Sequence, residues 1–164
     1  MAFVLDLARR NVASGSGGPF AAAVYEIASG RLLAAATNLV VASACSAAHA
    51  EVLALALAQQ AVGTHDLGAP GSPAVELVAS CEPCAMCLGA VAWSGVRRLV
   101  CAASGRDAEA LGFDEGPKPA DWVGELRRRE IEVVEGVMRE AAVAILHAYR
   151  AAGGRIYNAR AGSV

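Results

Sequence analysis

The stretch "SCEPCAMCLGA" at residues 80–90 carries a cysteine at every third position: Cys81, Cys84 and Cys87. The apolar run "AVELVAS", which ends at residue 80, predicts a short buried strand. Pro83 favours the first turn of a helix directly after it, because a proline there leaves no N–H unsatisfied. Such a helix would hold Cys84 and Cys87 on the same side of its first turn, where the N-terminus stabilises thiolate charge.

Disulfides, a metal site, a redox pair and plain packing would each account for these thiols. The chain has five cysteines, and an odd number in a cytoplasmic-looking sequence argues against a disulfide framework. A structural zinc site would need a second Cys-x-x-Cys or a histidine pair, and the sequence has neither. Taken alone, "PCAMC" at 83–87 is therefore either half of a zinc site or a redox pair.

His49, in "HAE" at residues 49–51, is the histidine that decides between these two. With Cys84 and Cys87 it would give zinc three protein ligands and leave the fourth tetrahedral position to water, as catalytic zinc sites do. Zinc lowers the pKa of bound water to about 7. Glu51 would lie beside that water as a proton carrier. We therefore predict one Zn²⁺ per chain, with Glu51 as the catalytic residue.

The composition limits the size, partners and location of the protein. A chain of 164 residues without a linker or repeat predicts a single domain over 1–164. A net charge of −2 and a pI of about 5.9 argue against a nucleic-acid partner, because phosphate backbones require a basic surface. No apolar run is long enough to span a membrane, and the beginning of the chain does not resemble a secretion signal. We therefore expect a cytoplasmic protein.

Hydrophobic periodicity and turn residues predict an α/β fold. In chain order the expected elements are a helix over 2–14, a hairpin over 20–38, a helix over 49–62, a strand over 74–80, a helix over 84–93, a strand over 97–103, helices over 106–111 and 122–129, a strand over 131–136 and a helix over 137–152. Strands that alternate with helices after an initial hairpin predict a mixed sheet covered by helices on both faces.

"HAE" at 49–51 followed by "PCAMC" at 83–87 resembles the zinc-dependent nucleobase deaminases of the cytidine deaminase superfamily. In such enzymes the glutamate is a general acid/base and not a zinc ligand. The resemblance implies the three-layer α/β/α cytidine deaminase-like fold, with a central mixed five-stranded sheet. It also implies hydrolytic deamination of a base.

Further stretches resemble the small bacterial guanine deaminases: "GGPFAA" at 17–22, Asn38, "SCEPCAMCLGA" and "AEALGFDEG" at 108–116. This resemblance implies that a free purine base is the small-molecule substrate, with guanine converted to xanthine and ammonia. It also implies that Asn38 contacts the purine and that Glu115 completes the base pocket. Asp114 is the neighbouring acid, and the sequence does not separate the two roles.

Further candidates for substrate contacts are Phe20, Ala50, Trp93 and Tyr157. Trp93 could equally be a core residue, and Phe20 could lie outside the pocket. Tyr157 would act as an aromatic lid. The family often forms dimers with crossed C-terminal segments, so the resemblance implies a homodimer and raises exchange of residues 153–164 as a hypothesis.

The remaining cysteines and histidines have simpler interpretations. We expect Cys45, Cys81 and Cys101 to be packed thiols. His65 and His147 are expected to be solvated or at the edge of the core.

Rival functions share the same zinc motifs: tRNA adenosine deaminase, cytosine or cytidine deaminase, and deaminase of a triazine such as ammeline. A tRNA enzyme would need a basic surface, which the acidic composition does not predict. A zinc-stabilised binding protein is the rival from another class, but a purely structural site has no use for Glu51.

Overall fold

A mixed five-stranded sheet with the strand order β2-β1-β3-β4-β5 organises the protein, whose computed structural model describes residues 1–158. The strands are β1 (Ala21–Glu26), β2 (Leu32–Thr37), β3 (Val75–Cys81), β4 (Arg98–Ala103) and β5 (Glu132–Val134). β1 pairs antiparallel with β2 and β3, whereas β3–β4 and β4–β5 pair parallel. The mixed five-stranded sheet predicted from the resemblance is confirmed.

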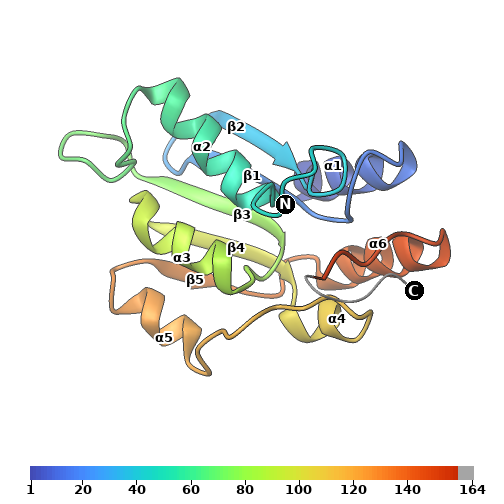
Figure 1. Cartoon of the computed structure of the whole chain (residues 1–164). Helices are drawn as coiled ribbons and strands as arrows, with labels where there is room; N and C mark the ends of the chain where they lie inside the picture. Colours follow the sequence, from blue (N-terminus) through green and yellow to red (C-terminus); the bar gives the residue numbers. More distant parts are fainter. Residues whose placement is uncertain (159–164) are drawn as a thin grey trace.

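Helices cover both faces of this sheet, as Figure 1 shows. The helices are α1 (Ala2–Ala13), α2 (Ala50–Val62), α3 (Ala85–Ser94), α4 (Gly105–Glu109), α5 (Trp122–Arg127) and α6 (Arg139–Ala151). One buried cluster joins α2, α3 and α5 to the sheet, and a second joins α1, α4 and α6 to the opposite face. The three-layer α/β/α architecture is therefore confirmed. Within residues 1–158, no helix has the length and apolarity that a membrane crossing requires.

The sequence of β3 is largely apolar because both faces of this strand are covered by helices. Leu77 and Ala79 belong to the cluster under α2 and α3, whereas Val78 between them belongs to the cluster under α1 and α6. Side chains alternate between faces along a strand, so a central strand covered on both sides needs apolar residues at successive positions. The carboxyl end of β3 then leads directly into α3.

Several helix boundaries differ from the prediction by one or two residues, and two of the starts have a clear cause in the backbone. The last helix begins at Arg139 and not at residue 137, because Gly136 (φ 73°) and Met138 (φ 58°) interrupt regular structure before it. The short helix begins at Gly105, one residue early, because Ser104 and Asp107 form a capping box.

Gly95 ends α3 in a place where only glycine fits. Its backbone is left-handed (φ 85°), and a Cβ there would lie 2.2 Å from Asp66 Oδ1 and 2.3 Å from Gly68 N. Gly63 ends α2 with a similar φ of 79°, but nothing lies within 4 Å of its Cβ position.

We expect Gly95→Ala to lower the free energy of unfolding by more than about 2 kcal/mol, because a backbone penalty and a steric clash add together. Gly63→Ala should cost only the backbone penalty of about 1 kcal/mol. Urea unfolding of both variants measures the difference, and equal losses would show that the contact around Gly95 is not tight.

Candidate active site

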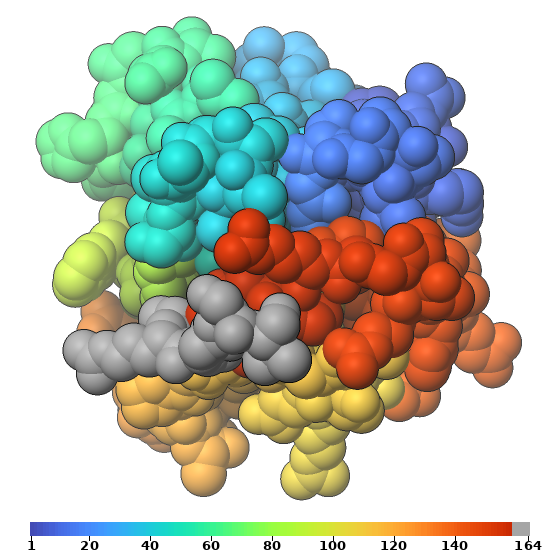
Figure 2. Space-filling view, turned by 45° about the vertical axis from the view of Figure 1, so that its right-hand side comes forward, coloured from blue at the N-terminus to red at the C-terminus, as the bar shows by residue number. Residues whose placement is uncertain are grey.

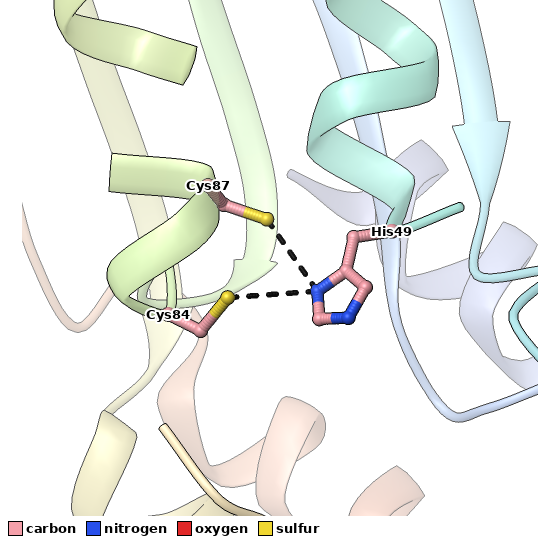
Figure 3. A group of neighbouring side chains, drawn as sticks. All are labelled: His49, Cys84 and Cys87. Atoms are coloured by element: carbon pink, nitrogen blue, oxygen red, sulfur yellow. Dashed lines mark hydrogen bonds between the residues drawn. The ribbon is translucent and has the colours of Figure 1, made fainter. Parts of the chain in front are cut away.

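The N-termini of α2 and α3 bring three potential metal ligands together. His49 is the N-cap residue of α2, Cys84 is the N-cap residue of α3, and Cys87 follows in the first turn. His49 Nδ1 lies 3.5 Å from the Sγ atoms of both cysteines, which come from a different part of the chain (Figure 3). All three ligand atoms lie within 4.8 Å of one another.

This geometry fits a zinc ion. Tetrahedral zinc with bonds of about 2.3 Å to sulfur and about 2.0 Å to nitrogen separates these two atoms by about 3.5 Å, which matches both distances from His49 Nδ1. One imidazole and two thiolates are ligands that zinc accepts readily. Three ligands leave one tetrahedral position open.

Charge at the cluster favours a cation. Hydrogen bonding from Cys87, helped by His49, lowers the pKa of Cys84 to about 4. The same bond and burial raise the pKa of Cys87, so the pair holds one thiolate and one thiol. Burial lowers the pKa of His49, but the neighbouring Cys84 thiolate outweighs it, and the net shift is upward. A metal ion would take the place of these protons.

Glu51 supplies a buried carboxyl next to the three ligands. It lies in the first turn of α2 and is only 8% exposed. Burial, with the negative charge of Cys84, raises its pKa to about 6, although a cation at the zinc site would lower that pKa again. A carboxyl whose pKa is near the ambient pH can both accept and donate a proton. Glu51 is therefore suited to move protons at this place.

A cavity of about 320 Å³ opens in front of the cluster, within the size range of small-molecule sites. Its walls come from five parts of the chain: the residue before β1, the segment from the end of β2 to the first turn of α2, the end of β3 with the start of α3, the 113–117 loop, and the C-terminal segment. The lining residues are Phe20, Asn38, Val40, Ser46, His49, Glu51, Cys81, Glu82, Cys84, Ala85, Met86, Phe113, Asp114, Glu115, Gly116, Pro117, Tyr157 and Asn158.

Asn38 is fixed in this wall by bonds on both sides. Its backbone N–H donates to Phe20 O at 2.9 Å, and its Oδ1 accepts from Val40 N at 3.2 Å. Asn11 reaches across from α1 and donates to the carbonyls of Gly18 (2.8 Å) and Asn38 (3.0 Å). The side-chain NH₂ group of Asn38 is thus oriented as a donor in the wall of the cavity. Its support from Asn11 was not predicted from the sequence.

The structure distinguishes the two neighbouring acids. Glu115 is 8% exposed, and burial raises the pKa of its carboxyl to about 8 even though Lys118 opposes the shift; a cation at the zinc site would lower that pKa again and favour the carboxylate. Asp114 is exposed, and its Oδ1 accepts a bond from Gly116 N at 2.8 Å, which closes a turn. Glu115 is therefore the buried acid of the cavity, while Asp114 lies at its rim and shapes the loop.

Three aromatic rings form one side of the cavity. Phe113 lies 5.0 Å from Phe20 and 5.5 Å from Tyr157 between ring centroids, in edge-on contacts, and Tyr157 lies 6.5 Å from His49. A Cβ at Gly18 would lie 2.4 Å from the Tyr157 hydroxyl, so glycine makes room for that ring. Phe113 was missed in the sequence, although it lies in the quoted "GFDEG" loop beside the two acids.

The described part of the C-terminal segment, residues 153–158, packs against its own chain. Asn158 donates to Gly112 O at 2.7 Å and accepts from Asp114 N at 3.0 Å. Figure 2 shows the C-terminal part of the chain, in red, beside the cyan segment that precedes α2. The rest of the segment proposed for exchange, 159–164, lies outside the described residues.

Two candidate contacts lie outside the cavity. Trp93 is 81% exposed, so neither stacking on a base nor core packing describes it. It follows Cys84 by nine residues, or two and a half helical turns, and so points to the opposite side of α3. Ala50 is completely buried and does not line the cavity, so the structure does not support a side-chain contact from it.

The other cysteines were predicted to be packed thiols and the other histidines to be solvated or at the edge of the core, and all but one of these predictions are confirmed. Cys81 and Cys101 are buried, and Cys81 also borders the cavity, where its thiol donates to Ser104 O at 3.5 Å. His65 and His147 are exposed. The prediction for Cys45 was wrong: it is exposed, because it lies in the turns that precede α2 and not in an element with a buried face.

Known proteins share both the sequence pattern and the fold. The family described as "Cytidine and deoxycytidylate deaminase zinc-binding region" matches residues 1–103. A guanine deaminase of Bacillus subtilis (strain 168) is 38% identical over 111 residues, which cover 68% of this chain and 67% of that protein.

Solved structures extend this similarity. The guanine deaminase from Nitrosomonas europaea is 60% identical, with a TM-score of 0.89 over 92% of this chain and 82% of the other. A structure of NE0047 in complex with 2,6-diaminopurine is 61% identical, with a TM-score of 0.91 over 97% and 84% of the two chains. A structure from work on tRNA:A34 deaminases, at 22% identity and a TM-score of 0.67 over 88% and 97% of the chains, shares the fold. The match over residues 1–103 and the identity to curated and solved relatives show that this chain belongs to the zinc-binding cytidine and deoxycytidylate deaminase family.

Proposed function

We propose that the protein catalyses the hydrolytic deamination of guanine to xanthine and ammonia. The observation that carries the proposal is the convergence of His49, Cys84 and Cys87 with the buried carboxyl of Glu51 at a cavity of about 320 Å³. Relatives with 38% and 60% identity are named guanine deaminases, which supports guanine as the substrate.

Glu51 would carry protons through the reaction. When bound, zinc would supply a Lewis acid that lowers the pKa of water to about 7. Glu51 accepts a proton from the attacking water and passes it to the ring nitrogen next to the amine-bearing carbon. The water oxygen bonds to that carbon, and Glu51 then takes the proton of the new hydroxyl group and gives it to the amine. The C–N bond breaks, ammonia leaves, and the carbonyl of xanthine remains. Exclusion of bulk water by the surrounding walls strengthens each of these interactions.

Recognition of guanine would depend on groups of opposite hydrogen-bonding character. Guanine offers N–H donors, for which the Glu115 carboxylate is an acceptor, and acceptor atoms, to which the Asn38 NH₂ group can donate. The rings of Phe20, Phe113 and Tyr157 would pack on the flat base. A hydrogen-bonded site of this kind discriminates strongly against bases that leave its polar groups unpaired.

We also propose a homodimer, as the family resemblance implies. Leu57 of α2 and Met86 and Trp93 of α3 are large apolar residues that are 46%, 41% and 81% exposed on helices that pack side by side. Burial of these side chains against a second copy would be favourable. A monomeric mass in sedimentation at micromolar concentration would contradict this. In such a dimer, exchange of the tail would transfer the contacts of Tyr157 and Asn158 to the partner.

A cytoplasmic location is the remaining proposal. None of the five cysteines, all of which lie within the described residues, is paired in a disulfide, as a reducing compartment would require. Fractionation of the cells that make the protein would test it, and recovery outside the cytoplasm would contradict it.

A substrate panel tests the proposed reaction. The zinc-loaded protein is incubated with guanine, adenine, cytosine, cytidine and ammeline, and ammonia release is measured. We expect guanine to have the highest kcat/KM, because its N–H groups and its acceptor atoms can pair with Glu115 and Asn38 at the same time. A higher value for any other compound, or deamination of tRNA and not of the free base, would refute the assignment.

Glu51→Gln is expected to keep one zinc per chain and to lower kcat by at least about 100-fold, because the amide cannot carry the proton. Metal analysis and guanine turnover measure the two effects. Glu125→Gln, which removes an exposed carboxylate from α5, should change neither. Turnover by Glu51→Gln within a few-fold of the unmodified protein would exclude the proton-carrier role.

Substitution of the two neighbouring acids separates their roles. Glu115→Gln should raise KM for guanine by about tenfold or more, because it removes a charged hydrogen-bond acceptor from the cavity. Asp114→Asn should have a much smaller effect, since Asp114 is exposed and bonded within its own turn. Steady-state kinetics on both variants decide the matter, and a larger effect from Asp114→Asn would reverse the assignment.

A further inference from the structure

Lys118 is the one lysine of the chain, since the other thirteen basic residues are arginine. It lies in the loop between α4 and α5, and its side chain is only 14% exposed. Lysine is almost never buried to this degree unless its ammonium is paired. The reaction described above gives it no role, so its burial needs another explanation.

Three oxygens surround the ammonium of Lys118. Nζ lies 3.2 Å from Pro83 O, 3.4 Å from Glu82 Oε2 and 3.9 Å from Glu115 Oε2. An ammonium has three donors spread about one point, whereas guanidinium presents a flat fork. This arrangement explains why lysine occupies the position in a chain that otherwise uses arginine.

The side chains of Lys118, Glu82 and Glu115 also meet at Gly105, the first residue of α4. A Cβ there would lie 3.0 Å from Lys118 Nζ, 3.4 Å from Glu82 Oε2 and 3.5 Å from Glu115 Oε2. Gly105 N also donates to Glu82 Oε2 at 2.9 Å. Glu82 is thus fixed by the backbone of α4, and together with Pro83 O it holds the ammonium of Lys118.

Glu115 depends on this lysine more than Glu82 does. Its Oε2 is buried and has no hydrogen-bond partner among residues 1–158, so Lys118 is the cation that offsets its charge there. The groups that act on Glu115 from other elements include Glu51 of α2, Cys84 of α3 and Glu109 of α4, all of which oppose its ionisation. Glu115 also borders both the base cavity and a second cavity of about 280 Å³ that Lys118 lines.

We propose that Lys118 is a positioning residue for the reaction: it pairs with Oε2 of Glu115 from behind and holds that carboxylate against the N–H groups of the bound base. This inference rests on the proposed function, in which Glu115 is the acceptor for guanine. Without the cation, the carboxyl groups of Glu82 and Glu115 would face each other at Gly105, and Glu115 would turn away or hold a proton more tightly.

The test measures guanine deamination by the full-length, zinc-loaded protein. K118M should raise KM for guanine by about tenfold or more, as removal of a charged partner does, with kcat within about threefold and zinc content unchanged. K118R keeps the charge with poorer geometry and should give an intermediate KM. The control is R106M, which removes another cation from the second cavity and should leave KM unchanged.

A double-mutant cycle with Glu115 shows whether Lys118 changes KM by acting through Glu115. In the E115Q background, K118M should change KM by less than about twofold, because the group through which the lysine acts is already gone. A purely structural lysine would give the same factor in both backgrounds. If K118M does not fold, K118Q, which keeps donors for Pro83 and Glu82 without the charge, carries the same expectations.

Several results would overturn the inference. An unchanged KM in K118M, or full additivity with E115Q, would show that Lys118 does not act through Glu115. Loss of zinc in K118M would show that it supports the metal-binding segment through Pro83 O instead. Failure of the unmodified protein to deaminate guanine would refute the proposed function itself, which makes the two failures distinguishable.

Discussion

The meeting of two helix N-termini is the constraint on which the rest of the structure depends. His49 and Cys84 are the N-cap residues of α2 and α3, and both have extended backbone with ψ of 148° and 173°. An N-cap side chain projects ahead of its helix, and the partial positive charge there favours thiolates and carboxylates. The parallel β3–α3–β4 crossover places α3 beside α2, and this packing fixes the distance between imidazole and thiols.

Near these helix N-termini the chain buries acidic side chains, although burial of an unpaired charge costs free energy. Glu51 and Glu115 are both 8% exposed, and burial raises the pKa of each. Such groups persist only where a partner or a cation compensates. A metal at the three ligands would compensate Glu51, and Lys118 compensates Glu115. The cavity thus lies between the candidate zinc ligands and Lys118, and the aromatic wall closes a third side.

Much of the fold was predictable because each element has a local cause. Gly30 lies at the turn between β1 and β2, Gly63 ends α2 with a left-handed backbone, and "AVELVAS" is apolar at successive positions because β3 is covered on both faces. The predictions were wrong at residues for which the sequence pattern did not show whether the side chain faces the interior or the solvent. Trp93 was assigned to the base or the core, but helical geometry turns it outward. Cys45 was expected to be buried, but the turns before α2 leave it at the surface.

The sequence by itself determined the order of helices and strands, the three candidate ligands and the carboxyl beside them, because spacing within one turn and the identity of a ligand atom are local properties. Only the tertiary structure decided which acid is buried, since Asp114 and Glu115 are adjacent in the chain and differ only in what packs around them. It also placed Tyr157 beside both His49 and Phe113, and it set Lys118 next to Glu115. These contacts join segments far apart in the chain or depend on how one loop folds back, and no short-range pattern records such distances.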